Sequence, residues 1–247
     1  MTSSETTRLR VRDTASVALA ITSGATDAVS FLALGGAFTS VMTGNLVLLG
    51  IAIGHLDGQL AVQIAVAVVG YVAGTAAGVR IVGHSAPDDP VWPAAVTRGL
   101  LTETSLFLLY AVGWWTSGAQ PGAVMSGLLT GLCAVALGVQ SGTVRRFGLS
   151  GLSTTYLTGT LTSLVDRLAT GGRLRREVRQ FAILIGLIVG AAVVAVLLAM
   201  HLGRFVLVVQ FVPLVAVTIA SVRLGGLRSG GGRPAKDAPT PAPQPET

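Results

Sequence analysis

Long apolar runs without a charged residue fill most of this chain. They extend from Gly58 to Val79, from Thr104 to Val144, from Gln180 to Gly203 and from Phe205 to Val222. A membrane-spanning helix needs about 20 mostly apolar residues, so these runs supply five spans, the second contributing to two. Thr14 to Leu56 contains one charged residue, Asp27, and supplies another span. The soluble alternative, buried parallel strands, would give runs of only about 4–8 residues.

The breaks between these runs predict eight helical segments in two sets of four. The first set comprises 15–34, 39–54, 60–83 and 93–116, and the second comprises 122–144, 151–165, 178–200 and 205–222. Segments 39–54 and 151–165 contain several hydroxyl groups and are shorter than a full span. We therefore predict an all-α membrane protein with about six transmembrane helices and two short broken or re-entrant segments.

A polar motif that occurs twice predicts an internal repeat. Thr39, Thr43 and Gly44 match Thr154, Thr158 and Gly159 at an offset of 115 positions, and Gly70 and Gly74 match Gly186 and Gly190 at an offset of 116. We expect repeat 1 at about 15–116 and repeat 2 at about 121–223, within one transmembrane domain of residues 14–224. Residues 1–13 are then a cytoplasmic N-terminal segment. Residues 225–247, rich in Gly, Pro and Ala, are expected to be a disordered cytoplasmic tail.

The arginine distribution bears on whether the two short segments cross the membrane. With eight crossings, Arg145 and Arg146 fall outside the cell. With six crossings, both termini and every arginine-rich loop lie on the cytoplasmic side, as the positive-inside rule requires. Six crossings also make the repeat inverted, a common plan among transporters. We favour six and keep eight as the alternative.

Composition excludes several functions. Charged residues are 11% of the chain, against about 25% in soluble domains. The basic residues are almost all Arg in termini and short loops without interleaved aromatics, so we expect a lipid bilayer as partner and no nucleic acid. Cys133 is the single cysteine, and no His/Cys cluster indicates a metal or cofactor. No hydrolase or phosphate-loop motif is present, so we expect no enzyme.

Asp27 is the sharpest candidate for a functional residue because a carboxylate near the middle of a span normally faces a cavity or a partner. It could bind a cation or proton, or hold structure by accepting hydrogen bonds from Ser and Thr. Two interpretations of Glu103 are open. It could be a second carboxylate in the same cavity as Asp27, or a structural partner of Arg98 or Arg80.

Two helix starts meeting at midplane would expose N–H groups able to bind an anion or polar solute; close helix packing is the alternative. The residues predicted to line this site are Asp27, Ser30, Thr43, Gly44, Asn45, Gln140, Thr158, Gly159 and Thr160. Gln140 and Ser141 align with Ala25 and Thr26, so the second copy offers a neutral amide near the position of the first copy's charge.

The motif from Gly24 through Asp27, Ser30 and Gly35-Gly36 to Met42-Thr43-Gly44-Asn45 resembles the signature of the YoaK family, polytopic bacterial inner-membrane proteins classed as a domain of unknown function. The resemblance covers about 15–222. It implies about six spans and an inner-membrane location, and no established substrate. The second copy departs from the pattern at the positions of Asp27 and Asn45.

These features lead to three functional hypotheses. The first is a secondary transporter or permease for a small solute or ion. The second is a non-transporting scaffold or sensor whose polar residues join helices. The third, an intramembrane enzyme, needs a base near Ser30 or Ser141. The sequence is compatible with a homo-oligomer and leaves substrate, direction and coupling ion open.

Overall fold

The computed structural model describes residues 3–83, 92–145, 162, 165, 169 and 177–229, and within these ranges all regular structure is helical. The long helices are α1 (Ser3–Ala33), α3 (Gly58–Val82), α4 (Ala94–Thr116), α5 (Ala123–Arg145), α7 (Glu177–Ala199) and α8 (Val206–Ser229). A short helix, α2 (Met42–Gly54), and a 3₁₀ turn, η1 (Gly203–Phe205), complete the described elements. The prediction of an all-α membrane protein is confirmed.

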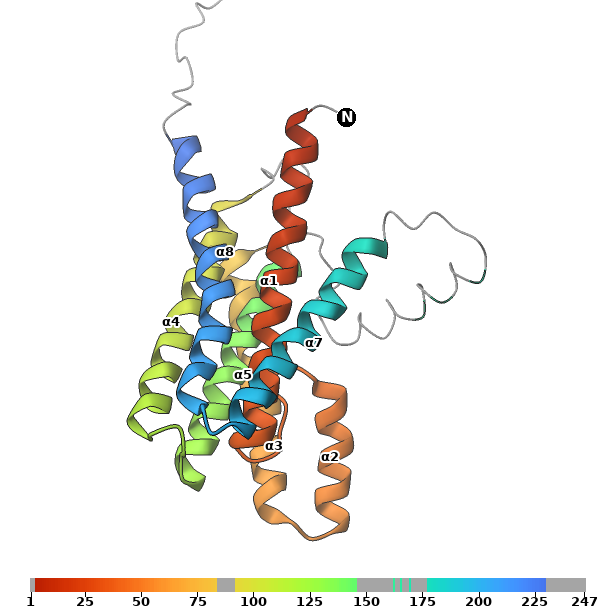
Figure 1. Ribbon diagram of the computed structural model, residues 1–247, viewed down its shortest axis with the longest axis vertical. Helices are drawn as coiled ribbons and strands as arrows, with labels where there is room; N and C mark the ends of the chain where they lie inside the picture. Colours follow the sequence, from red (N-terminus) through yellow and green to blue (C-terminus); the bar gives the residue numbers. More distant parts are fainter. Residues whose placement is uncertain are drawn as a thin grey trace, which may run out of the picture.

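The long helices form one bundle (Figure 1). Five contain stretches long and apolar enough to cross a membrane, among the described residues: Val11–Ala33, Gly58–Val82, Ala123–Arg145, Gln180–Ala199 and Gly203–Leu224. α4 has 23 residues, about 35 Å of helix. Arg98 and Glu103 lower its hydropathy, which accounts for its absence from that set.

Helix α2 is too short to span a bilayer. Its 13 residues extend about 20 Å, against a hydrocarbon core of about 30 Å. α2 packs beside α3 at the end of the bundle where α1 finishes (Figure 1). The short helical segment predicted after the first span is therefore present, and six crossings rather than eight stays a prediction. Segment 151–165 lies outside the described residues.

Helix-to-helix contacts are most extensive in two pairs, α1 with α7 and α3 with α5. Glycines make these contacts possible. A Cβ atom at Gly74 would overlap the backbone carbonyl of Val135 on α5, and one at Gly190 would overlap that of Ile21 on α1. In a membrane, small residues of this kind let two backbones approach until van der Waals contact is continuous.

Three predicted boundaries were wrong. α1 begins at Ser3 rather than near residue 15, and α8 continues to Ser229 through the glycines expected to open the tail. Arg, Glu and Leu continue a helix as readily outside the membrane as inside, so the apolar run marks the span rather than the helix. α2 starts at Met42 rather than Thr39, because the preceding residues are held in a loop by Asp27.

Candidate functional site

A non-helical loop, residues 34–41, turns back from the end of α1 into the bundle, and Asp27 holds its far end. Asp27 Oδ1 accepts hydrogen bonds from the Thr39 backbone N–H at 2.7 Å, the Thr39 hydroxyl at 2.9 Å and the Ser40 N–H at 2.8 Å. Its Oδ2 accepts from the Ser40 hydroxyl. The Asp27 side chain is buried, so its four donors are all protein groups. This is the structural alternative for Asp27; ion binding by Asp27 stays a prediction.

Asn45 on α2 holds the middle of the same loop. Its Oδ1 accepts from the Phe38 N–H at 2.9 Å, and its Nδ2 donates to the Phe38 carbonyl at 2.7 Å. The amide thereby satisfies both backbone polar groups of Phe38, which would otherwise be unpaired in hydrocarbon. Gly44 leaves room for the Phe38 ring, which stacks on Phe31 at 4.7 Å between centroids.

The remaining predicted residues of the first half divide between two environments. Thr43, in the first turn of α2, is exposed and contributes no hydrogen bond within the described residues. Ser30 is fully buried, and its hydroxyl lies 3.5 Å from that of Thr130 on α5. Thr158, Gly159 and Thr160 lie outside the described residues.

Gln63 on α3 joins the start of the loop to α5. Its Nε2 donates to the Leu34 carbonyl and the Thr130 hydroxyl, each at 2.6 Å. Gly35, with φ of 123°, allows the chain to turn beside this amide, because an L side chain rarely adopts that backbone conformation. Gln63 Oε1 has no hydrogen bond to any residue that the structure describes, although the side chain is only 8% exposed.

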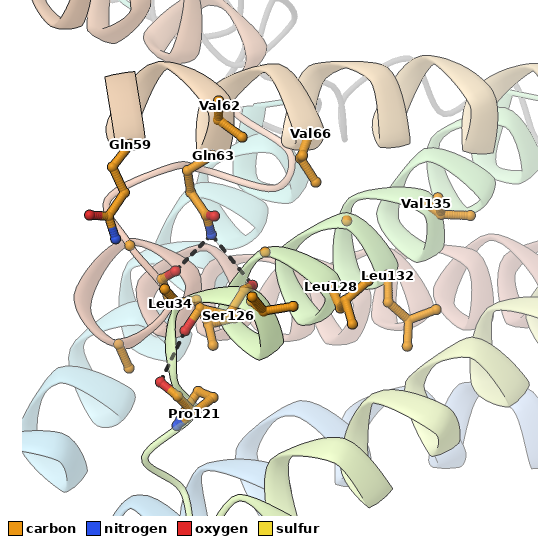
Figure 2. Close-up of a pocket in the computed structure, with 16 residues that line it drawn as sticks. Leu34, Gln59, Val62, Gln63, Val66, Pro121, Ser126, Leu128, Leu132 and Val135 are labelled. Carbon is orange, nitrogen blue, oxygen red and sulfur yellow. Dashed lines mark hydrogen bonds between the residues drawn. The ribbon is translucent and has the colours of Figure 1, made fainter. Parts of the chain in front are cut away.

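A hollow lined by described residues lies at this point, and we call it the Gln63 cavity (Figure 2). It has a volume of about 1170 Å³ between the end of α1 and the first turns of α3 and α5. Its walls are mostly apolar, and its polar side chains are Gln59, Gln63 and Ser126. Asp27 is not among its lining residues. The cavity therefore offers amide and hydroxyl groups rather than charge.

A second buried chain of hydrogen bonds crosses the bundle between α1, α5 and α4. The Ser23 hydroxyl donates to Gln140 Oε1 at 2.8 Å, and Gln140 Nε2 donates to Glu103 Oε1 at 2.7 Å. Arg80 and Arg98 are both exposed, and neither forms an ion pair with Glu103 in the described structure. The alternative in which Glu103 pairs with Arg98 or Arg80 is therefore not found among the described residues, where its hydrogen-bond partner is the Gln140 amide.

The structure thus separates the predicted site into groups. Asp27 and Asn45 meet at the loop, Ser30 adjoins Thr130 and Gln63, and Gln140 pairs with Glu103. Gln63 was missed in the sequence, although Gln59 and Gln63 stand one helical turn apart in an otherwise apolar run. No group of three or more His, Cys, Asp or Glu side chains that could hold a metal ion occurs among the described residues.

Long apolar helices, a short helix and a partly buried loop fixed by polar side chains define a multi-pass helical membrane protein. The family model described as protein of unknown function (DUF1275) matches residues 15–220, and the chain belongs to this family. It is also 31% identical to the UPF0700 transmembrane protein YoaK of Bacillus subtilis (strain 168) over 163 residues, which cover 66% of this chain and 69% of that protein. No solved structure matches the chain.

Proposed function

We propose that this protein is a secondary transporter or permease for a small polar solute, which enters the Gln63 cavity. The carrying observation is that a non-helical loop and a cavity with a free amide oxygen meet at one residue, Gln63. Non-helical backbone at membrane depth is tolerated where it is buried in protein or lines a water-filled cavity. A neutral lining with an unused acceptor suits a solute that donates a hydrogen bond. No catalytic step is part of this proposal.

An inverted repeat is part of the proposal, and the register of the glycine contacts supports it. Gly24 on α1 lies against the Leu187 carbonyl on α7, and Gly138 on α5 lies against the Tyr71 carbonyl on α3. In the same way, Gly190 lies against the Ile21 carbonyl and Gly74 lies against the Val135 carbonyl. Exchanging α1 with α5 at an offset of 114, and α3 with α7 at 116, maps each contact onto its counterpart.

This packing register differs by one residue from the offset of 115 inferred from the sequence, and it pairs Gln140 with Thr26. Gln140 bonds Glu103 on α4, and Thr26 accepts from Gln210 on α8 at 3.1 Å. The two buried polar contacts therefore occupy equivalent places in the proposed halves. The first half contains three long helices, α1, α3 and α4. Because this number is odd, α5 runs antiparallel to α1, as an inverted repeat requires.

We further propose that the membrane is the bacterial inner membrane, with both termini in the cytoplasm. The start of α1 and the end of α8 lie at the same end of the bundle (Figure 1). Arg98 and Arg145 occur at helix ends facing that side, in agreement with the positive-inside rule.

One observation favours the alternative, a non-transporting membrane protein. All four hydrogen bonds to Asp27 come from the protein itself, as expected of a residue that holds structure. On this alternative the Gln63 cavity is a lipid-filled surface groove, and Gln63 only joins the loop to α5.

Flux measurements in proteoliposomes test the proposal across a panel of small metabolites and ions. Val62 and Val69 lie on α3 with similar exposure, 64% and 68%, but only Val62 lines the cavity. Val62→Trp should sharply reduce flux of any transported solute, whereas Val69→Trp should leave it near the wild-type rate. Equal flux in the two variants would show that the cavity is not the route. Absence of flux for every solute in the wild type would favour the non-transporting alternative.

A further inference from the structure

Glu103 is a buried carboxyl group with only one hydrogen-bonded oxygen. Its side chain is fully buried in the middle of α4, and Oε1 accepts from Gln140 Nε2 at 2.7 Å. Oε2 is also buried and has no hydrogen-bond partner among the described residues. A polar atom left unpaired inside a protein costs free energy, so this oxygen requires an explanation.

The side chains facing Glu103 are neutral. On α5 Gln140 bonds Glu103, while Thr143 lies against Gly99, one turn before Glu103, with its hydroxyl bonded to the Val139 carbonyl. On α8 Thr218 bonds Thr104 rather than Glu103. The buried titratable groups on the helices of the described bundle include Tyr110, two turns along α4, Cys133 on α5 and Asp27 on α1, none of which supplies positive charge. Arg98, five residues before Glu103 on α4, is exposed. No ion pair to Glu103 occurs in the described part of the chain.

Asp27 shows how this protein can surround a buried carboxyl group with hydrogen-bond donors. It accepts four hydrogen bonds from the loop, enough to replace the water it has lost. Glu103 has one donor and no counter-ion at comparable depth. An unpaired buried charge costs several kcal/mol. The two carboxyl groups therefore have opposite environments within one bundle.

We propose that Glu103 is a proton-binding site and that its bound proton is the coupling ion of the transporter. The coupling role rests on the function proposed above, whereas the proton site stands on the geometry alone. Gln140 determines which oxygen carries the proton: its N–H occupies Oε1, so the proton is on Oε2. On release, the Oε2–H bond breaks, the proton passes to a water molecule that reaches Oε2, and the carboxylate keeps its bond from Gln140.

Dicyclohexylcarbodiimide tests the proton site on the full-length protein without any solute. This apolar reagent adds to a protonated carboxyl group: the acid proton moves to one reagent nitrogen and the carboxyl oxygen bonds the central carbon. The adduct rearranges to a stable acylurea that mass spectrometry locates on a peptide. We expect the label on Glu103, retained in Asp27→Asn and lost in Glu103→Gln. Wild-type protein without label at Glu103, or with equal label on Asp27, would overturn the proposal.

Infrared spectroscopy of the wild type and Glu103→Asp guards against misfolding of the glutamine variant. A protonated carboxyl group gives a carbonyl stretch distinct from that of a carboxylate. We expect this band in the wild type, shifted in Glu103→Asp and absent in Glu103→Gln. A wild-type spectrum without the band contradicts the proton site. If Glu103 is labelled but no solute is transported, the transport function is rejected and the proton site stands. If solute is transported but Glu103 is not labelled, only the proton site is rejected.

Discussion

The carboxylate of Asp27 accepts a hydrogen bond of 2.7 Å from the backbone N–H of Thr39, twelve residues later in the chain. This bond, with those to Ser40, draws the end of the loop against α1 less than two turns before that helix ends. A charged acceptor gives hydrogen bonds roughly twice as strong as a neutral one. Here the acceptor is buried, and its donors belong to the buried Thr39 and the half-buried Ser40. The Asp27 carboxylate in the first span therefore holds the loop that precedes α2 in place.

Asp27→Asn should destabilise the protein by about 3 kcal/mol, because the amide replaces one accepting oxygen with a donor that faces the Ser40 hydroxyl. Thermal or denaturant unfolding in detergent measures the change. Asp57→Asn is the matched control, since Asp57 also accepts a backbone bond, from Leu60 at 3.0 Å, but is exposed. Its effect should stay within about 1 kcal/mol. Similar small losses in both variants would mean that Asp27 does not hold the loop.

The sequence predicted the helices well because each depends on a local pattern. The break after α1 follows from Gly35-Gly36, and the ends of α3, α4, α5 and α7 lie within two residues of their predicted places. The start of α2 could not be predicted in this way. Thr39 and Ser40 continue the helical pattern of their neighbours, and only a carboxylate from another helix removes their N–H groups from the helix.

The candidate site was predicted in part for the same reason. Asp27 and Asn45 stood out as polar residues in apolar sequence, but their shared partner is a loop, which periodicity does not reveal. Gln63 looked like a single neutral residue of α3. Its importance depends on the Leu34 carbonyl, which has no intrahelical partner because α1 ends just before it, and which Gln63 bonds instead.

Asn45→Asp should cost about 1–3 kcal/mol of stability, because aspartate can accept from the Phe38 N–H but cannot donate to the Phe38 carbonyl. Thr43→Val on the same helix turn is the comparison, since Thr43 is exposed; its effect should lie within about 0.5 kcal/mol. Unfolding midpoints in one detergent measure both. If the two substitutions have equal effects, the Asn45 amide is not what holds Phe38.

Gly74→Ala and Gly190→Ala should each destabilise the protein by about 1–3 kcal/mol, because the added methyl group overlaps a backbone carbonyl of the facing helix. The proposed repeat predicts losses of similar size at these two positions. Gly50→Ala is the control: a Cβ there meets nothing within 4 Å. That substitution should be neutral or stabilise α2 by about 0.5–1 kcal/mol. A large loss at Gly74 with none at Gly190 would contradict the equivalence of the two contacts.

Cysteine labelling distinguishes six crossings from eight. Cys133→Ala gives a background without cysteine, since Cys133 is the only one in the chain and is buried. Leu56, 91% exposed between α2 and α3, and Ser117, between α4 and α5, are then replaced singly by cysteine. With six crossings and a cytoplasmic N-terminus, a membrane-impermeant maleimide should label both in intact cells, whereas Asp13→Cys should react only after permeabilisation. If α2 crossed the membrane, Leu56→Cys and Ser117→Cys would both be protected in intact cells. The 13-residue length of α2, shorter than the hydrocarbon core of a bilayer, leads us to expect labelling at both positions.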